Sequence, residues 1–246
     1  MEYVLMDRVS AQVIVLGNYV SMTIIPTQLV KDILQHTITK TIVDHYTWFY
    51  NSKLYLFGGY NNYDIYHDLW EYDPSLNEWI QLNALSFPQS LLFVVESAVV
   101  FVPKQSSFDL YIYGGIDGRD YNAIYSLYRY SSISNTWVQL RDGPVGYEGA
   151  KAVYVNETNS IRVVSGYPVN DQYYNNHILY TFEYSIDSDI WIVVAPRSVD
   201  QVRYQSTANY FGDNYAVVYG GILPSSTDAC FESSLQVLDL RTYLLN

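Results

Sequence analysis

The residues best suited to catalysis or metal binding are few in this sequence and form no recognised pattern. The four histidines, His36, His45, His67 and His177, include no H-x-H pair, and Cys230 is the single cysteine. Zinc sites need clustered Cys or His ligands, whereas phosphate-binding and hydrolase motifs need glycine-rich sequences around Lys or Ser. None of these patterns occurs. We therefore predict that the chain is not an enzyme and has no catalytic residue, metal site or cofactor.

One stretch contains part of a calcium-binding pattern. The segment "GGIDGRDYN" supplies Asp117, Gly118 and Asp120. A calcium-binding loop of this type also needs further oxygen ligands and a closing Glu, which are missing. An Asp-Gly pair is also a frequent signal for a hairpin turn. We therefore interpret the segment as a hairpin-type loop.

Charge and hydropathy exclude several classes of partner. Of the 246 residues, 25 are acidic and 13 are basic, so the formal net charge is -12. Proteins that bind nucleic acid neutralise phosphates with Lys and Arg, so this balance predicts no nucleic-acid partner. The longest apolar stretch, residues 91–102, contains Glu96. Because a membrane span needs about 20 apolar residues, we predict no membrane insertion.

Two sequence markers recur along the chain in the same phase. Hydrophobic runs end in Gly58-Gly59, Gly114-Gly115 and Gly220-Gly221, and a degenerate copy ends in Ser165-Gly166. The second residues of these pairs are 56, 51 and 55 positions apart. Tyr72, Tyr130 and Tyr184 are each followed seven residues later by Trp79, Trp137 and Trp191. A period near 50 residues indicates a repeat architecture.

Each repeat contains four short stretches rich in aromatic and branched residues, separated by turn-forming residues. Four antiparallel strands repeated at this period form a β-propeller blade, so the predicted fold is all-β. We place the blades at about 42–93, 94–148, 149–203 and 204–246. Residues 1–41 are expected to be an N-terminal extension or a degenerate partial blade, with strands in "QVIVLGN" and "VSMTIIP" and a helix in "TQLVKDILQH". The glycines would permit positive φ and close approach of a neighbouring blade, and each Trp would fill space between sheets.

These residues give the chain a resemblance to the kelch-repeat family over residues 42–246. The stretch "LYRYSSISNTWVQL" is also similar to the propeller of attractin and its relatives. Two departures stand out: Ser165 replaces a glycine, and Leu238 and Leu245 replace the Tyr and Trp in the fourth repeat. Kelch propellers usually close with five to seven blades, so the chain is expected to be a fragment or a divergent copy.

The resemblance implies several functions, because propellers support many unrelated ones. The first is a non-catalytic module that binds another protein. An alternative is a copper-radical oxidase, whose copper is held by two Tyr and two His. Further alternatives are a carbohydrate-binding propeller and a fragment of a larger extracellular attractin-like receptor.

In a propeller blade, the loops that join strands two and three lie on the same face as the loops that lead to the next blade. Here these loops are rich in Tyr, Asn and Arg, which are common in binding surfaces. The predicted binding residues are Tyr60, Asn61, Tyr63, Asp117, Arg119, Tyr121, Arg141, Tyr147, Tyr173 and Arg203. The expected partner is a protein, and further domains of a longer chain are a second class of partner.

The compartment is left open between a cytoplasmic adaptor and an extracellular domain. The sequon Asn156-Glu157-Thr158 would carry a glycan if the chain is secreted. Asn156 is expected in the turn between the first two strands of the third repeat. That turn belongs to the face opposite the predicted binding loops.

Overall fold

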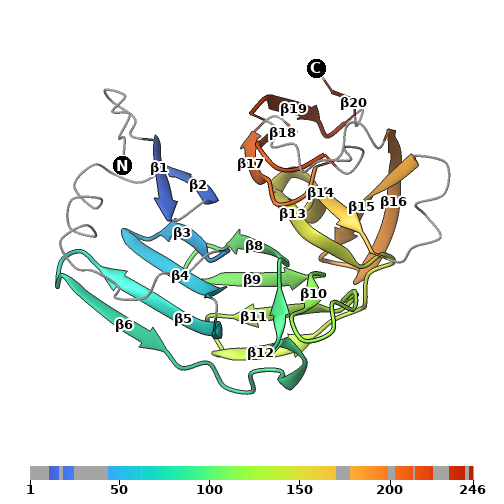
Figure 1. Ribbon diagram of the computed structural model, residues 1–246. Coiled ribbons are helices and arrows are strands. Elements are labelled where there is room, and N and C mark those ends of the chain that lie inside the picture. Colours follow the sequence, from blue (N-terminus) through green and yellow to red (C-terminus); the bar gives the residue numbers. More distant parts are fainter. Residues whose placement is uncertain are drawn as a thin grey trace. The chain divides into compact units, whose positions relative to one another are not determined.

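The computed structural model describes residues 11–16, 19–24, 44–61, 63–169, 178–198, 203–212, 214–223, 233–241 and 244–245 (Figure 1). These residues form strands, turns and two short 3-10 helices, so the chain is all-β. The chain divides into two compact units, residues 1–92 and residues 93–246. Each unit is described by itself.

The first unit contains a two-stranded and a four-stranded antiparallel sheet. The strands β1 (Ala11–Leu16) and β2 (Tyr19–Ile24) pair with each other, as expected for the two strand-like stretches near the N-terminus. The expected helix of "TQLVKDILQH" lies outside the described residues. The four-stranded sheet runs in chain order through β3 (Tyr46–Tyr50), β4 (Lys53–Tyr60), β5 (Ile65–Asp73) and β6 (Glu78–Leu82). A 3-10 helix, η1 (Gln89–Leu91), follows it.

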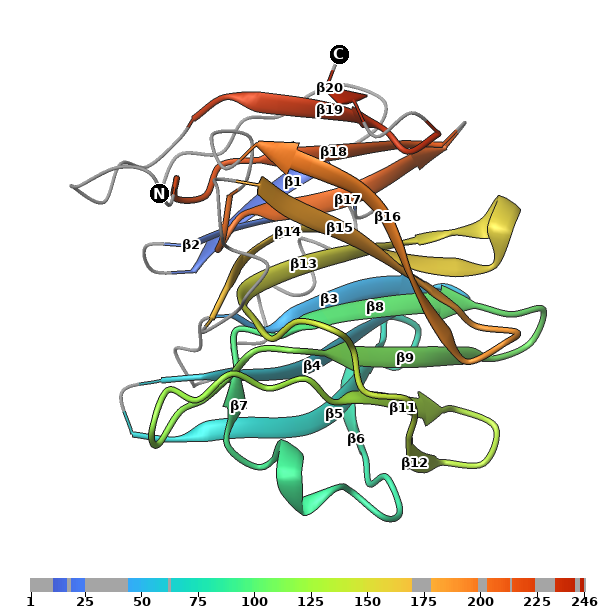
Figure 2. The same cartoon turned by 90° about the vertical axis from the view of Figure 1, so that its right-hand side faces the viewer.

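The second unit contains three more four-stranded sheets, each in chain order (Figure 2). The second sheet consists of β8 (Ala98–Pro103), β9 (Phe108–Tyr113), β11 (Leu127–Ser131) and β12 (Thr136–Gln139). The third consists of β13 (Tyr147–Val155), β14 (Ser160–Pro168), β15 (Ile178–Ser185) and β16 (Ile190–Ser198). The fourth consists of β17 (Thr207–Gly212), β18 (Tyr215–Tyr219), β19 (Leu235–Asp239) and β20 (Leu244–Leu245).

Within this unit the first strands of successive sheets pack on one another, β13 against both β8 and β17. Two short strands, β7 (Val94–Val95) and β10 (Ile116–Asp117), form a further small sheet. The prediction of four four-stranded blades is therefore confirmed. The blade boundaries given above stay predictions.

The recurring Tyr and Trp face each other on the third and fourth strands of three sheets. Tyr72 pairs in register with Trp79, Tyr130 with Trp137 and Tyr184 with Trp191. The ring centroids of the three pairs are 5.2, 5.3 and 5.2 Å apart, and the planes are tilted by 44°, 43° and 48°. Aromatic pairs prefer such tilted arrangements. The spacing of seven residues therefore reflects one cross-strand aromatic pair per sheet.

A third residue, which the sequence analysis did not recognise, contacts each of these Tyr and Trp pairs. Asn77, Asn135 and Asp189 lie five residues after the Tyr and have φ of 55°, 54° and 53°. Each accepts a hydrogen bond from the Tyr hydroxyl, at 2.7, 2.9 and 2.8 Å. Asn and Asp tolerate this left-handed conformation better than most residues. The full pattern is Y-x4-[N/D]-x-W, which is visible in the sequence once the turn geometry is known.

Trp191 also confirms the expected packing between sheets. Its ring lies 4.5 Å from that of Tyr113 on β9, and its Nε1 donates a hydrogen bond to the Arg141 carbonyl at 3.0 Å. Both partners belong to the second sheet or the segment that leaves it. The buried core here combines residues of β8, β9, β13, β14 and β15. Trp191 therefore closes the outer part of the space between the second and third sheets.

Two of the repeated glycines, Gly115 after β9 and Gly166 within β14, form backbone hydrogen bonds to residues at or just before the start of the next sheet. Gly115 has φ of 92°, and a Cβ at this position would lie 2.4 Å from the Val95 carbonyl oxygen. Its N–H donates to the Tyr147 carbonyl at 2.8 Å, and the Gly166 N–H donates to the Arg203 carbonyl at 2.7 Å. The expected positive φ and close backbone approach are confirmed. These two bonds join the second sheet to the third and the third to the fourth.

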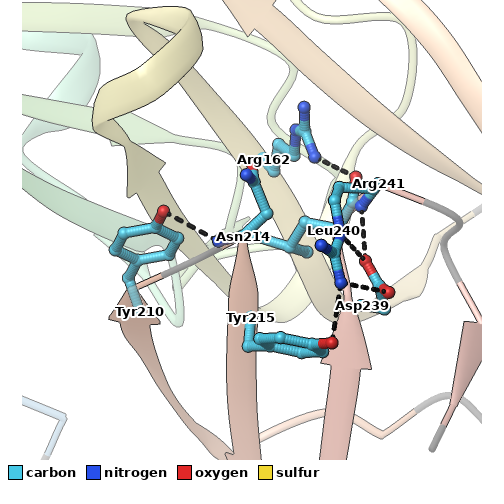
Figure 3. A network of polar contacts seen from close by, with 7 residues as sticks. All are labelled: Arg162, Tyr210, Asn214, Tyr215, Asp239, Leu240 and Arg241. Atoms are coloured by element: carbon cyan, nitrogen blue, oxygen red, sulfur yellow. Dashed lines mark hydrogen bonds and ion pairs between the residues drawn. The ribbon is translucent and has the colours of Figure 1, made fainter.

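The fourth sheet uses polar contacts where the others use the Tyr and Trp pair. Leu238 and Leu245 are in register, as their spacing predicts. The buried Arg162 of β14 donates to the Leu240 carbonyl (Figure 3). It also donates to Glu183 at 2.9 Å. Arg241 contacts Asp239 at 2.9 Å and the Tyr215 hydroxyl at 2.7 Å (Figure 3). Arg162 thus ties the third sheet to the turn that follows β19.

Candidate protein-binding loop

Backbone hydrogen bonds hold the loop of residues 114–126, between β9 and β11, in a defined conformation. Gly118 N–H donates to the Phe93 carbonyl at 2.8 Å, which anchors the loop to the segment before β7. Within the loop, Asp117 N–H donates to the Asn122 carbonyl at 2.9 Å and Tyr121 N–H to the Asp117 carbonyl at 2.8 Å. The predicted hairpin-type loop is therefore a folded element with fixed side-chain directions.

Arg119 is held in one position by two neighbours. Its guanidinium lies 4.1 Å from the centre of the Phe93 ring. Its Nε and Nη2 donate to the two carboxylate oxygens of Asp117, at 2.9 and 2.5 Å. Hydrogen bonding from Arg119 lowers the pKa of Asp117, and the same bond raises the pKa of Arg119. The side chain of Arg119 is nevertheless 61% exposed, so it stays available to a partner.

Tyr121 has an unfavourable backbone conformation and an exposed side chain. Its φ is 59°, in the left-handed region, and the residue is 71% exposed. This conformation costs roughly 1–2 kcal/mol for a residue other than glycine. Burial of the ring within the chain does not offset this cost. Unusual backbone conformations concentrate at binding sites, so Tyr121 is a candidate recognition residue.

The corresponding loop of the first unit is shorter. Asn61 Oδ1 accepts hydrogen bonds from the N–H groups of Tyr63 and Asp64, both at 2.8 Å, and its Nδ2 donates to the Tyr66 hydroxyl at 2.9 Å. Tyr63 is 92% exposed, while Tyr60 is half-buried at the end of β4. The three predicted residues Tyr60, Asn61 and Tyr63 therefore lie in or beside one turn, with Tyr63 pointing into solvent.

Two predicted binding residues, Tyr147 and Arg203, are buried, so little of either side chain is exposed for contact with a partner. Tyr147 is the first residue of β13, is 4% exposed and packs against Phe182. Arg203 is also 4% exposed and donates to the Ser234 carbonyl at 2.6 Å and to the Ser234 hydroxyl at 2.7 Å. Both residues carry the carbonyls that accept the glycine N–H groups, so they lie inside the packing of neighbouring sheets. They are structural residues.

The other predicted site residues have separate locations. Arg141 is exposed, and its N–H donates to Asp189 at 3.2 Å across the gap between two sheets. Tyr173 lies outside the described residues. Asn156 begins the 3-10 helix η2 (Asn156–Thr158), between β13 and β14, and is exposed. Its glycosylation stays a prediction. Phe93 was missed in the sequence, because nothing in its spacing indicates the contact with Arg119.

The titratable residues of the described segments give no sign of a metal centre. His45 has a lowered pKa, mainly because burial disfavours its charged form. His67 stacks on Phe87 with the ring centroids 4.5 Å apart. Among the described residues, no group of three or more His, Cys, Asp or Glu could hold a metal ion. No helix in the same residues is long and apolar enough to cross a membrane. His36, His177 and Cys230 lie outside the described residues.

Comparison with protein families is consistent with the repeated sheets. The model of the Attractin/LZTR1 beta-propeller family matches residues 6–243. The chain belongs to this family. A search of curated proteins found no match. The resemblance to attractin that "LYRYSSISNTWVQL" suggested is thereby confirmed, and so is the kelch-type fold.

Propellers of the Attractin/LZTR1 type commonly mediate protein binding. In this member of the family, the loop of residues 114–126 and the adjacent Phe93 present one oriented cation and exposed aromatic rings. Phe93, Tyr121 and Tyr125 are 39%, 71% and 36% exposed. Arg and Tyr are enriched among residues that dominate protein interfaces. The geometry therefore suits recognition of another protein.

Proposed function

We propose that this chain is a non-catalytic propeller domain that binds another protein through residues 116–123 and Phe93. The observation that carries the proposal is the backbone of Tyr121, which is left-handed although its side chain is 71% exposed. The fold gains little burial from this ring, and we attribute the presence of Tyr in this costly conformation to contact with a partner.

Arg119 complements Tyr121 in this role. Arg119 is oriented before binding by Phe93 and Asp117, so little side-chain entropy is lost when a partner docks. Tyr121 supplies a large contact area with few rotatable bonds. The exposed Tyr63 in the first unit and the exposed Arg141 in the second unit are further proposed contacts.

Site-specific photo-crosslinking tests this proposal. A benzophenone amino acid is placed at position 121 and, as a control, at Ile133, which is 76% exposed in the turn between β11 and β12. Expression in cells and irradiation should link a protein partner at position 121 and not at position 133. Equal labelling at both positions, or no adduct at position 121, would contradict the proposal.

A further inference from the structure

The outermost strand of the third sheet has an unusual edge. β16 is the last strand in the order β13-β14-β15-β16 and spans nine residues, whereas β6 has five and β12 has four (Figures 1 and 2). Three of its apolar residues, Ile190, Ile192 and Val193, are 46%, 48% and 54% exposed. A long, apolar edge strand presents unpaired backbone groups to which another strand can add.

The other two repeats that contain the Trp protect the same edge with polar residues. When the Trp residues are aligned, the position before them holds Glu78 and Thr136 but Ile190 in the third repeat. Proteins usually shield sheet edges with short strands and with charged or polar residues. The third repeat lacks this protection at two positions.

The second of these positions lies two residues after the Trp. Gln81 and Gln139 occupy it in the first two repeats, and Val193 occupies it in the third. The position directly after the Trp is apolar and part-exposed in all three, at 40% for Ile80, 44% for Val138 and 48% for Ile192. The difference is therefore confined to the two positions where a polar residue would discourage pairing.

We propose that β16 binds an extended segment of a protein partner, which adds to the third sheet as a fifth strand. Backbone hydrogen bonds to residues 190–195 would provide the affinity, and the exposed side chains would select the sequence. Pro196 has no N–H and therefore ends the run available for pairing. This inference rests on an element separate from residues 116–123 and does not depend on the function proposed above.

The size and charge of the edge favour such a segment over a second copy of the chain. Six residues of strand span about 20 Å. Pairing along this length alone would bury less than the about 1,200–2,000 Å² typical of stable interfaces between folded proteins. Two copies would also each bring a net charge of -12. An extended segment suits such a narrow edge, because strand addition draws its affinity from backbone hydrogen bonds rather than from a large buried area.

The side chains around β16 indicate the chemistry of that segment. Ile190 and Ile192 share one face of the strand, so apolar and β-branched residues at alternate positions would pack beside them. Asp187, exposed in the turn before β16, is held by the Asn159 side-chain amide at 2.6 Å. The segment is therefore expected to alternate apolar residues and to carry Lys or Arg near the end that meets Asp187.

A random peptide library displayed on phage provides the probe. The library is selected on the purified wild-type chain, and recovered peptides are synthesised and their affinities measured. Ile192→Lys should weaken binding about tenfold or more, because a charge replaces the apolar contact. The matched control Val138→Lys, at the same position on β12, should leave the affinity unchanged. Thermal melts verify folding, and Ile192→Thr provides a milder second variant.

Two further readouts are specific to strand addition. N-methylation of alternate peptide amides should abolish binding, because it removes the backbone donors. Hydrogen exchange should slow in β16 and not in β12 when the peptide is bound. The proposal fails if no peptide is enriched, if Ile192→Lys binds as well as the wild type, or if N-methylation has no effect. A wild-type dimer that Ile192→Lys converts to a monomer would assign the edge to a second copy instead.

Discussion

The two ends of the second sheet are built in different ways. At one end, around the turn between β11 and β12, Tyr130 packs on Trp137 and donates a hydrogen bond to Asn135. The same hydrogen bond from Tyr to Asn or Asp recurs in the first and third sheets. At the other end, the loop of residues 114–126 has its own short strand and the oriented Arg119, while the corresponding loop of the first sheet is a turn organised by Asn61.

This difference separates residues that stabilise the fold from residues that could recognise a partner. Side chains at the turn end recur with nearly constant distances in three sheets, because each of these sheets closes its outer strands with the same aromatic pair. Side chains at the loop end do not recur, which agrees with the proposed binding role, since a binding surface needs a specific shape and not a repeated one. Changes at the turn end should therefore reduce stability, and changes at the loop end should reduce binding.

The largest effect is expected at Gly115, the repeated residue at the base of the loop. A Cβ on Gly115 would lie 2.4 Å from the Val95 carbonyl oxygen, a backbone atom paired in the β7–β10 sheet. Gly115→Ala should lower the free energy of unfolding by about 3 kcal/mol, from backbone strain and overpacking together.

Gly212 provides the control, because it has φ of 86° with no atom within 4 Å of its Cβ position. Gly212→Ala should therefore cost only about 1 kcal/mol in urea denaturation. Equal losses would show that the close approach is unimportant.

The next effect concerns the turn end. Asn135→Ala removes the acceptor of the Tyr130 hydroxyl and places alanine at φ of 54°. The expected loss is about 2 kcal/mol, of which about 1 comes from the hydrogen bond and about 1 from backbone strain. Asn135→Gly removes only the bond and should cost about half as much. Urea denaturation of both variants measures the two contributions, and an equal loss for Ala and Gly would contradict the role of the left-handed turn.

A smaller effect of opposite sign is expected at the loop end. Tyr121→Gly removes a side chain that is 71% exposed and relieves a backbone with φ of 59°. The free energy of unfolding should rise by about 1 kcal/mol. Ile133→Gly, at an exposed position without positive φ, should give no gain. A loss of stability in Tyr121→Gly would show that the ring makes contacts that support the fold.

The smallest effect is a pH dependence at the turn end. Burial raises the pKa of Tyr130 above its usual value of 10.0. Because the folded-state pKa exceeds the unfolded-state value, this stability is present below about pH 10 and is lost as the pH rises through the folded-state pKa. Tyr130→Phe should therefore show a shallower loss of stability between about pH 9 and 11. Parallel curves for the two proteins would contradict the prediction.

Much of the fold could be predicted from the sequence because the repeated residues report directly on strand positions. Gly115 follows β9 closely, and Trp137 lies on β12 in register with Tyr130 on β11. The burial of Tyr147 and Arg203 could not be predicted, since "RDGPVGYE" has the composition of a turn although Tyr147 begins a strand.

The contents of the candidate site were harder to predict for a physical reason. Arg119 is oriented by Phe93, which lies 26 positions earlier in the sequence, and neither residue belongs to the repeat. Contacts between unrepeated residues leave no periodic signal. The left-handed φ of Tyr121 likewise has no sequence signature, because Gly and Asn are the residues usually expected there.

The most direct test of the central claim is the affinity of the protein recovered by crosslinking at position 121. Biolayer interferometry would compare the wild-type chain, Tyr121→Ala and the matched exposed variant Ile133→Ala. A role for Tyr121 in recognition predicts binding weaker by about tenfold or more for Tyr121→Ala, and unchanged binding for Ile133→Ala. Unchanged affinity in a folded Tyr121→Ala variant would contradict recognition through this loop.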